Sequence, residues 1–257
     1  MTHVVVFRSL LRAATRDAIS IGWAVIFPLA LIVGMRIAFG EGLDEMRLLA
    51  GTVAFSTIFF AVHGTGFDIH GQRARGVYKL LKASPYPVLG FIIWLVLARG
   101  ALAVLAALTV AVLGGLWLGV AFTPTLLLGL VASAALGAVA FSALGVVMGN
   151  LGNTEGAVSA WNNLVTFPLL FLTETFYSLA NAPAWLQLVR DILPFNHYLL
   201  LTNHLAAGDP LAAVPELLIT LGFGVAFLAV AVWTFRWDPA QPLWSAQLPW
   251  HPRRSAT

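Results

Sequence analysis

Long apolar runs, separated by short polar stretches, make up most of the chain. Within each run the apolar residues are continuous rather than alternating, which favours membrane-spanning helices over the strands of a barrel. A span needs roughly 20 apolar residues to cross about 30 Å of hydrocarbon. Six runs qualify, at 22–39, 48–67, 100–122, 126–148, 158–176 and 217–235. The pattern predicts an all-α integral membrane protein with six transmembrane helices in a single domain over residues 1–257.

The third run has an ambiguous beginning. Apolar sequence starts at Val88, but Arg99 interrupts it. One helix over 88–122 would be about 50 Å long at roughly 1.5 Å per residue. We therefore expect residues 88–98 to lie partly in the inner interface of the membrane, with Arg99 near the start of the third span.

Three other segments do not fit a span. Residues 1–20 gather arginines on one side of a helix, which is typical of a helix that lies along the inner membrane surface. Residues 183–205 are apolar but are interrupted by Pro194, which predicts an outer re-entrant pair of short helices before the sixth span. Residues 236–257 are rich in proline and tryptophan, and we expect them to form an irregular cytoplasmic tail.

Composition excludes several classes of protein. The chain is 60% hydrophobic and 10% charged, whereas soluble domains carry about 25% charged residues. It has no cysteine, which excludes disulfides and thiolate metal sites. The basic residues are dispersed between spans, so nucleic acid is not an expected partner. No phosphate loop or hydrolase motif occurs, so we expect no catalytic residue, no metal, no cofactor bound by this chain and no ATP hydrolysis by it.

Lysine and arginine decide the predicted orientation, because cytoplasmic loops carry an excess of them. With the N-terminus inside, only Arg36, Arg47 and Arg190 fall outside, and Arg99 is borderline. The bias predicts a multi-pass protein with both termini in the cytoplasm. The basic residues that then lie inside are Arg8, Arg12, Arg16, Arg73, Arg75, Lys79, Lys82, Arg236, Arg253 and Arg254.

The loop between the second and third spans, residues 73–85, has the pattern of a short amphipathic helix. One face of this helix is predicted to carry Val77, Leu80, Leu81 and Ser84. Another face is predicted to carry the basic residues Arg75, Lys79 and Lys82. Pro85 and Pro87 end the helix and stiffen the return to the membrane. Such a helix suits the binding of a cytoplasmic partner, although a basic loop that only fixes topology remains an alternative.

This loop also carries a family resemblance. The segment Gly76-Val-Tyr-Lys-Leu-Leu-Lys-Ala-Ser-Pro85 resembles the G-T-L-K-x-L-x-A-T-P signature of permease subunits of ATP-binding cassette exporters of the drug and polysaccharide class, the type-two permease family. A second stretch, Phe167-Pro-Leu-Leu-Phe-Leu-Thr-Glu-Thr-Phe-Tyr-Ser-Leu179 followed by Pro183-Ala-Trp-Leu-Gln187, resembles that family's P-L-x-F-L-S-G-x-F-F-P…L-P-x-W-L-Q pattern. Asp191-Ile-Leu-Pro194 with Tyr198 resembles the stretch after it, and Arg99 resembles the basic residue that enters the third span. The resemblance covers almost the whole chain.

The resemblance implies a transport subunit rather than an enzyme, in a bacterial cytoplasmic membrane. It implies partners: separate ATPase subunits that bind ATP and Mg, and a second permease copy or homologue. An amphiphilic drug, lipid or similar substrate would be exported. Residues 73–85 would be the coupling helix, contacting the ATPase through Arg75, Gly76, Val77, Lys79, Leu80, Leu81, Lys82, Ser84 and Pro85. The chain departs from the family at Gln72 and Ala74, where acidic residues are usual, and at Glu174 and Ser178.

Polar residues inside the predicted spans are the remaining candidates. Glu174 would be an outer-gate or substrate-path residue, because a carboxylate in a span faces a cavity or a partner by default; the alternative is a hydrated position at the outer interface. Asn162, Asn163 and Thr166 would line the translocation path, or would only hydrogen-bond between helices.

Several other interpretations of the chain stay open. His63, Asp68 and His70 sit near the inner end of the second span, where a hydrated cluster is favoured over a metal site. A proton-coupled secondary transporter would use Glu174 and His63 as carriers. A membrane-embedded lipid-modifying enzyme or protease would need ionisable groups gathered at one depth. A permease that serves immunity or copper-linked maturation would keep the same fold.

Overall fold

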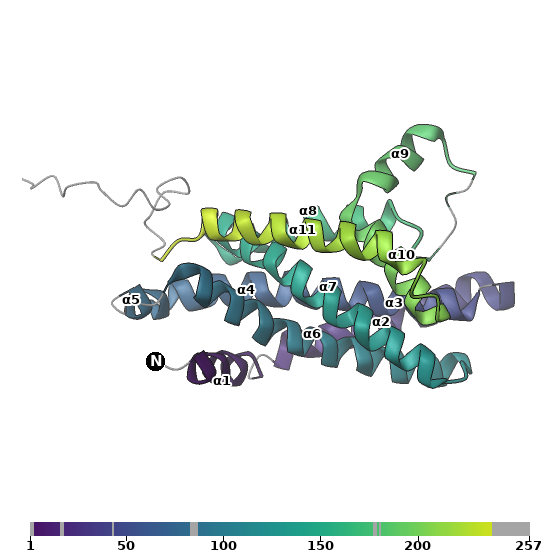
Figure 1. The fold of residues 1–257 in the computed structure, drawn as a ribbon, viewed down its shortest axis with the longest axis horizontal. Helices are drawn as coiled ribbons and strands as arrows, with labels where there is room; N and C mark the ends of the chain where they lie inside the picture. Colours follow the sequence, from purple (N-terminus) through teal and green to yellow (C-terminus); the bar gives the residue numbers. More distant parts are fainter. Residues whose placement is uncertain are drawn as a thin grey trace, which may run out of the picture.

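The computed structural model describes residues 3–15, 18–42, 44–82, 87–176, 179 and 181–237, and over these residues it is helical with no strand (Figure 1). The first half of the chain forms α1 (His3–Ala14), α2 (Ala18–Phe39), the 3-10 turn η1 (Gly40–Gly42), α3 (Glu45–Phe59), the π-helix η2 (Phe60–Gly64), α4 (Thr65–Ala74) and α5 (Val77–Lys82). The second half forms α6 (Val88–Leu118), α7 (Pro124–Leu151), α8 (Glu155–Phe171), α9 (Ala184–Ile192), α10 (Pro194–Ala207) and α11 (Ala213–Thr234).

Five helices in the described part of the chain are long and apolar enough to cross a membrane: α2, the unbroken helix α3–η2–α4, α6, α7 and α11. They contain the runs predicted at 22–39, 48–67 and 126–148, all but the last residue of 217–235, and most of the run at 100–122. The fifth predicted span, 158–176, is helical only to Phe171. At 17 residues, α8 is about 25 Å long, and Pro168 in its last turn removes one backbone hydrogen bond where the helix ends.

The third predicted span begins earlier than expected. α6 is one helix of 31 residues, about 46 Å long, and it passes through Arg99 without a break. Pro87 is extended at its start, and Gly119 ends it with a φ of 75°. Residues 88–98 are therefore continuous with the rest of α6, and the point at which this helix enters the membrane stays a prediction.

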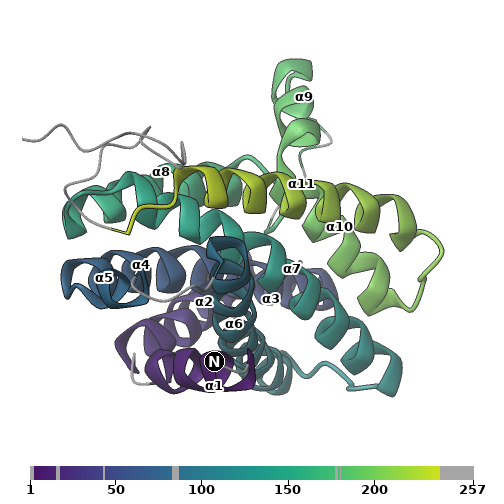
Figure 2. The same ribbon diagram turned by 60° about the vertical axis from the view of Figure 1, so that its left-hand side comes forward.

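The short helices lie at the two ends of the bundle (Figures 1 and 2). One end, called the α5 end below, carries α1 and α5. The other, called the α9 end, carries the turns between α2 and α3, α6 and α7, and α10 and α11, and α9 projects from it. The predicted segments 1–20 and 183–205 are helical in α1, α9 and α10. Most of the predicted tail 236–257, and Ser84 and Pro85 of the predicted coupling helix, lie outside the described residues.

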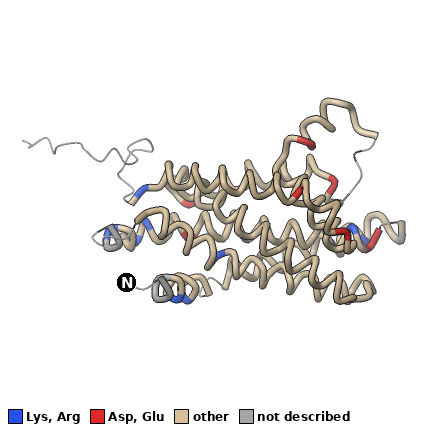
Figure 3. Tube along the Cα trace, in the orientation of Figure 1, with Lys and Arg blue, Asp and Glu red and all other residues tan. Residues whose placement is uncertain are grey.

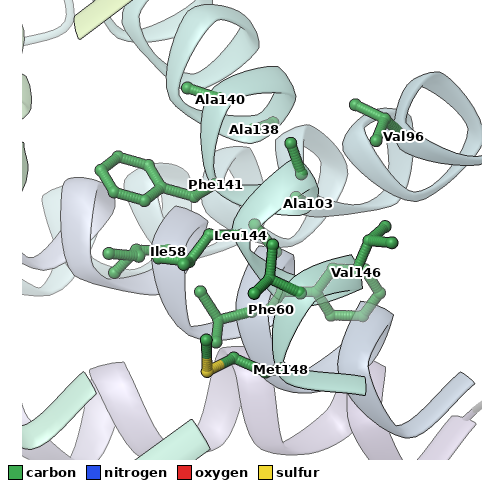
Figure 4. Close-up of a cluster of buried hydrophobic side chains, with 14 of the residues drawn as sticks. Ile58, Phe60, Val96, Ala103, Ala138, Ala140, Phe141, Leu144, Val146 and Met148 are labelled. Atoms are coloured by element: carbon green, nitrogen blue, oxygen red, sulfur yellow. The ribbon is translucent and has the colours of Figure 1, made fainter. Parts of the chain in front are cut away.

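The long helix α7 lies at the centre and packs against α6, α10, α11 and the α3–η2–α4 helix. Close approach depends on glycine: a Cβ on Gly145 would meet the carbonyl oxygen of Ala61, and one on Gly149 would lie 2.8 Å from the Cβ of Ile69. Around these contacts, buried apolar side chains such as Phe60 and Phe141 fill the interior (Figure 4).

Candidate functional site

The predicted partner-binding loop folds as α5, a helix of six residues after a turn at Gly76. Gly76 has a φ of 74°, a left-handed conformation that favours glycine, and its N–H donates to the carbonyl of Arg73 at 3.0 Å. Val77, Lys79 and Arg75 are exposed, as a docking surface requires. The side chains of Leu80, Leu81 and Lys82 lie outside the described part of the structure.

Tyr78, which the sequence analysis did not single out, anchors α5 to the bundle. Its side chain is fully buried, and its ring lies 5.4 Å from that of Phe91 in α6 and 5.5 Å from that of Phe235 after α11. Burial raises the pKa of its hydroxyl above the ordinary value. The hydroxyl has no hydrogen-bond partner in the described structure, so the ring rather than the hydroxyl holds the helix in place.

Two arginines join the helix ends beneath α5. Arg73 at the end of α4 donates to the carbonyls of Gly149 at 3.0 Å and Arg236 at 3.1 Å, and to the side-chain oxygen of Asn150. Arg236 donates to the backbone carbonyl of Asn150 and to Asn153. Both cations therefore meet the carbonyl end of α7, where positive charge is favoured. The contacts fix α4, α7 and the end of α11 to one another.

A buried ion pair links α4 to α6. Arg99 is 1% exposed, and its guanidinium contacts the carboxylate of Asp68 at 2.8 Å and 3.1 Å. Gln72 donates to the same carboxylate at 2.6 Å. Within the residues that the structure describes, no three His, Cys, Asp or Glu side chains are grouped closely enough to hold a metal ion, so His63, Asp68 and His70 do not form one cluster there.

Polar residues meet where α8 crosses the second long helix. His63, in the π-helix η2, lies 3.2 Å from the side-chain oxygen of Asn163 and stacks on Phe59. Asn162 is fully buried against Gly66. The side-chain polar atoms of Asn162 and Thr166 have no hydrogen-bond partner among the described residues. Single-turn π-helices are frequent at functional sites, and this one faces the polar stripe of α8.

A cavity of about 820 Å³ opens beside this crossing. Its walls include the aromatic side chains of Trp23, Phe59 and Phe67, and its polar lining includes His63, Asp68, Arg75 and Glu155. Arg75 and Glu155 stand at the helix ends nearest α5. The cavity therefore combines aromatic walls with ionisable groups toward the α5 end.

Glu174 lies in a separate network at the α9 end. Its carboxylate contacts Arg190 of α9 at 2.7 Å and Arg47 of α3, and it accepts the backbone N–H of Leu179 at 3.2 Å. Arg190 also pairs with Asp191 at 2.8 Å, and hydrogen bonds to Asp191 and Glu174 raise the pKa of its guanidinium. The structure thus places Asn163 against His63 and Asn162 against Gly66, but leaves Glu174 apart, bound by two guanidinium groups.

Charged residues gather toward the two ends of the bundle, and the middle is almost free of them (Figure 3). A helical bundle with five apolar helices of spanning length, a polar crossing in its interior and charged ends is the arrangement of a multi-pass membrane protein. The family model for the ABC-2 type transporter matches residues 2–201, and the chain belongs to that family. Permeases of this family normally work with ATP-binding cassette ATPase subunits. No curated protein matches the chain.

Proposed function

We propose that this permease exports an amphiphilic drug, lipid or similar substrate across a bacterial cytoplasmic membrane, with both termini in the cytoplasm. Separate ATPase subunits that bind ATP and Mg supply the energy. The permease pairs with a second copy or a homologue. α5 and the turn at Gly76 form the coupling site, where the ATPase docks.

The buried ring of Tyr78 is the observation that carries this proposal. A helix of six residues is not stable alone, but Tyr78 fixes α5 to α6 and to the residue after α11. Because Arg73 ties the adjoining end of α4 to α7, a push on α5 moves four long helices together rather than deforming a loop. To shift the permease from one conformation to another, the ATPase must favour one conformation by several kcal/mol. A rigid connection through α5 transmits that free energy to the long helices.

The translocation path is proposed to run along the crossing of α8 with α3–η2–α4. Buried polar groups without protein partners usually meet water or a ligand, which supports Asn162 and Thr166 as lining residues. The aromatic cavity beside His63 suits the apolar part of an amphiphile, and Arg75 and Glu155 suit its polar part. Glu174 closes the outer end of this path through its two arginines, instead of carrying a cation along it.

The second permease is proposed to cover α8. One stripe of that helix exposes the large side chains of Trp161, Leu164, Phe167 and Phe171 at helical spacing. The stripe follows the polar crossing along the same helix, so a partner placed there would complete the walls of the path.

Copurification tests the coupling site. The double substitution Leu80→Asp and Leu81→Asp, on the predicted apolar face, should leave membrane insertion intact and abolish copurification with the coexpressed ATPase subunit. Leu211→Asp, exposed at the α9 end, is the matched control and should copurify. An active ATPase recovered with the double variant would contradict the assignment of α5.

Reconstitution separates the proposal from its main rival. The permease in proteoliposomes should transport nothing under a proton gradient, and should transport only with the ATPase subunit, Mg and ATP. Gradient-driven transport by the permease alone would instead support a proton-coupled secondary transporter. Glu174 lies in a separate network from His63 and Asp68, and Asp68 is paired with Arg99, which does not favour a membrane-embedded enzyme with one catalytic cluster.

A further inference from the structure

The imidazole of His197, near the start of α10, joins three helices at the α9 end. Its Nδ1 lies 2.7 Å from a carboxylate oxygen of Glu216 in α11, and its Nε2 lies 2.9 Å from the backbone carbonyl oxygen of Asp191 in α9. The ring also stacks on Phe223 of α11, with 6.4 Å between the ring centroids, which holds both nitrogens toward these oxygens. One side chain thus connects α9, α10 and α11.

The end of α9 depends on this contact. The last carbonyls of a helix have no partner within the helix, and Pro194, three residues after Asp191, has no backbone N–H to donate. α9 also projects from the bundle (Figure 1), and none of its residues is fully buried. Polar contacts such as that of His197, rather than buried apolar side chains, therefore hold α9 in place.

The two contacts of His197 fix the number of protons that it shares with Glu216. A backbone carbonyl only accepts hydrogen bonds, and so does an ionised carboxylate, whereas a neutral imidazole has a single N–H to donate. Both contacts form together when a doubly protonated imidazole meets a carboxylate, or when a neutral imidazole meets a protonated carboxyl group. In either arrangement the pair holds one proton more than a neutral imidazole beside a carboxylate.

The surroundings leave Glu216 as the partner that decides this charge. α7 has no ionisable side chain, and Glu216 is the one in α11. α10 itself also carries Tyr198, which is buried, and His204, about two turns farther along. The charged side chains of α3 and α9 are engaged in ion pairs of their own: Glu45, Arg47, Arg190 and Asp191.

We propose that His197 and Glu216 form a proton-dependent latch that holds α9 against the bundle. When the shared proton leaves, a nitrogen lone pair faces an oxygen at one of the two contacts, and that contact is lost. The side chains are 17% and 18% exposed, so the proton exchanges with the solution at the α9 end. Lower pH on that side therefore favours the closed latch, and higher pH favours its release.

The latch would regulate the closure at Glu174, and in this respect it rests on the proposed function. α9 carries Arg190, whose guanidinium lies 2.7 Å from the Glu174 carboxylate. Because His197 holds the next residue, Asp191, by its carbonyl, release of the latch also loosens the pair of Arg190 with Glu174. A higher pH at the α9 end would thus favour opening of the outer end of the path.

Spin labels can report the position of α9 in the permease alone. Because the chain has no cysteine, Leu188→Cys in α9 and Leu211→Cys in the turn before α11, both at exposed positions, take the only two labels. Double electron–electron resonance in lipid nanodiscs should give one narrow distance distribution near pH 5 and a broader or second population near pH 8, roughly the range over which histidine changes its charge. The same distribution at both ends of this range would overturn the proposal.

Glu216→Gln separates a proton-dependent latch from a contact that is only structural. The new side-chain amide donates to Nδ1, so a neutral imidazole can meet both partners with its single N–H on Nε2. This variant should keep the narrow distribution over the whole pH range, whereas the control His204→Gln, on the same helix, should respond to pH as the unsubstituted protein does. A pH response or a broad distribution in Glu216→Gln, or loss of the response in His204→Gln, would contradict the latch.

These measurements involve neither the ATPase nor a transported substrate. Failure of the latch would therefore leave the proposed export untouched, and failure of export would appear only in the reconstitution experiment with the ATPase subunit.

Discussion

The ion pair between Arg99 and Asp68 gives a quantitative test of how the interior is held together. Arg99→Met keeps the length of the side chain but removes both contacts to the Asp68 carboxylate, at 2.8 Å and 3.1 Å. Gln72 remains as a donor at 2.6 Å, which does not replace a positive charge. Breaking a buried pair in this way typically costs about 3–5 kcal/mol, because it leaves a charge without its counter-ion. We expect a destabilisation in that range.

A double-mutant cycle makes this prediction specific. Unfolding measured in the same detergent for Arg99→Met, Asp68→Leu and the double variant should give a double cost well below the sum of the two single costs. Arg12→Met, on an exposed position of α1, is the control for loss of an arginine and should change stability by less than about 0.5 kcal/mol. Additive costs, or a cost of Arg99→Met as small as that of the control, would refute the coupling.

Three further predictions concern the coupling site and the outer network. Tyr78→Ala should destabilise by about 3–5 kcal/mol and uncouple ATP hydrolysis from transport, whereas Tyr78→Phe should preserve both, because it removes only a buried hydroxyl without a partner. Gly76→Ala should cost about 1–2 kcal/mol because of its left-handed backbone, measured by thermal unfolding. Glu174→Gln should weaken both arginine contacts and increase protease access to α9 in the absence of ATP, and access equal to that of the unsubstituted protein would count against the outer closure.

The helices were predicted well where the length and continuity of an apolar run are enough to set their boundaries. The ends of α2, α7 and α11 differ from the predicted boundaries by at most four residues. In α7, the helix-start signals Thr123 and Pro124 lie directly before the apolar run. Two short helices, α9 and α10, meet at Pro194 as the sequence predicted, whereas their re-entry into the outer leaflet stays a prediction. These features depend on local sequence and need no knowledge of neighbours.

The errors came from contacts between distant segments. Arg99 was expected near the start of a span, which stays a prediction, but the sequence did not reveal that Asp68, 31 residues earlier, accepts its guanidinium inside the bundle. Tyr78 was missed because its burial depends on Phe91 and Phe235, which no spacing within 73–85 reveals. In α8 the predicted helix continued to 176, whereas the structure turns after Phe171 and directs Glu174 to Arg47 and Arg190.

Three arginines at the α9 end are exceptions to the predicted excess of basic residues on the cytoplasmic side, and contacts within the bundle account for them. Arg36, Arg47 and Arg190 were the exceptions predicted to lie outside, and each is paired in the structure: Arg36 with Glu45 at 3.2 Å, and the other two with Glu174. A paired arginine also donates its hydrogen bonds to protein oxygens rather than to lipid phosphates. Arg73, at the α5 end, differs from these three because the oxygens that accept its hydrogen bonds are neutral. Because the carboxylates gather where arginine is least expected, net positive charge concentrates at the α5 end, which is the distribution expected of a cytoplasmic face.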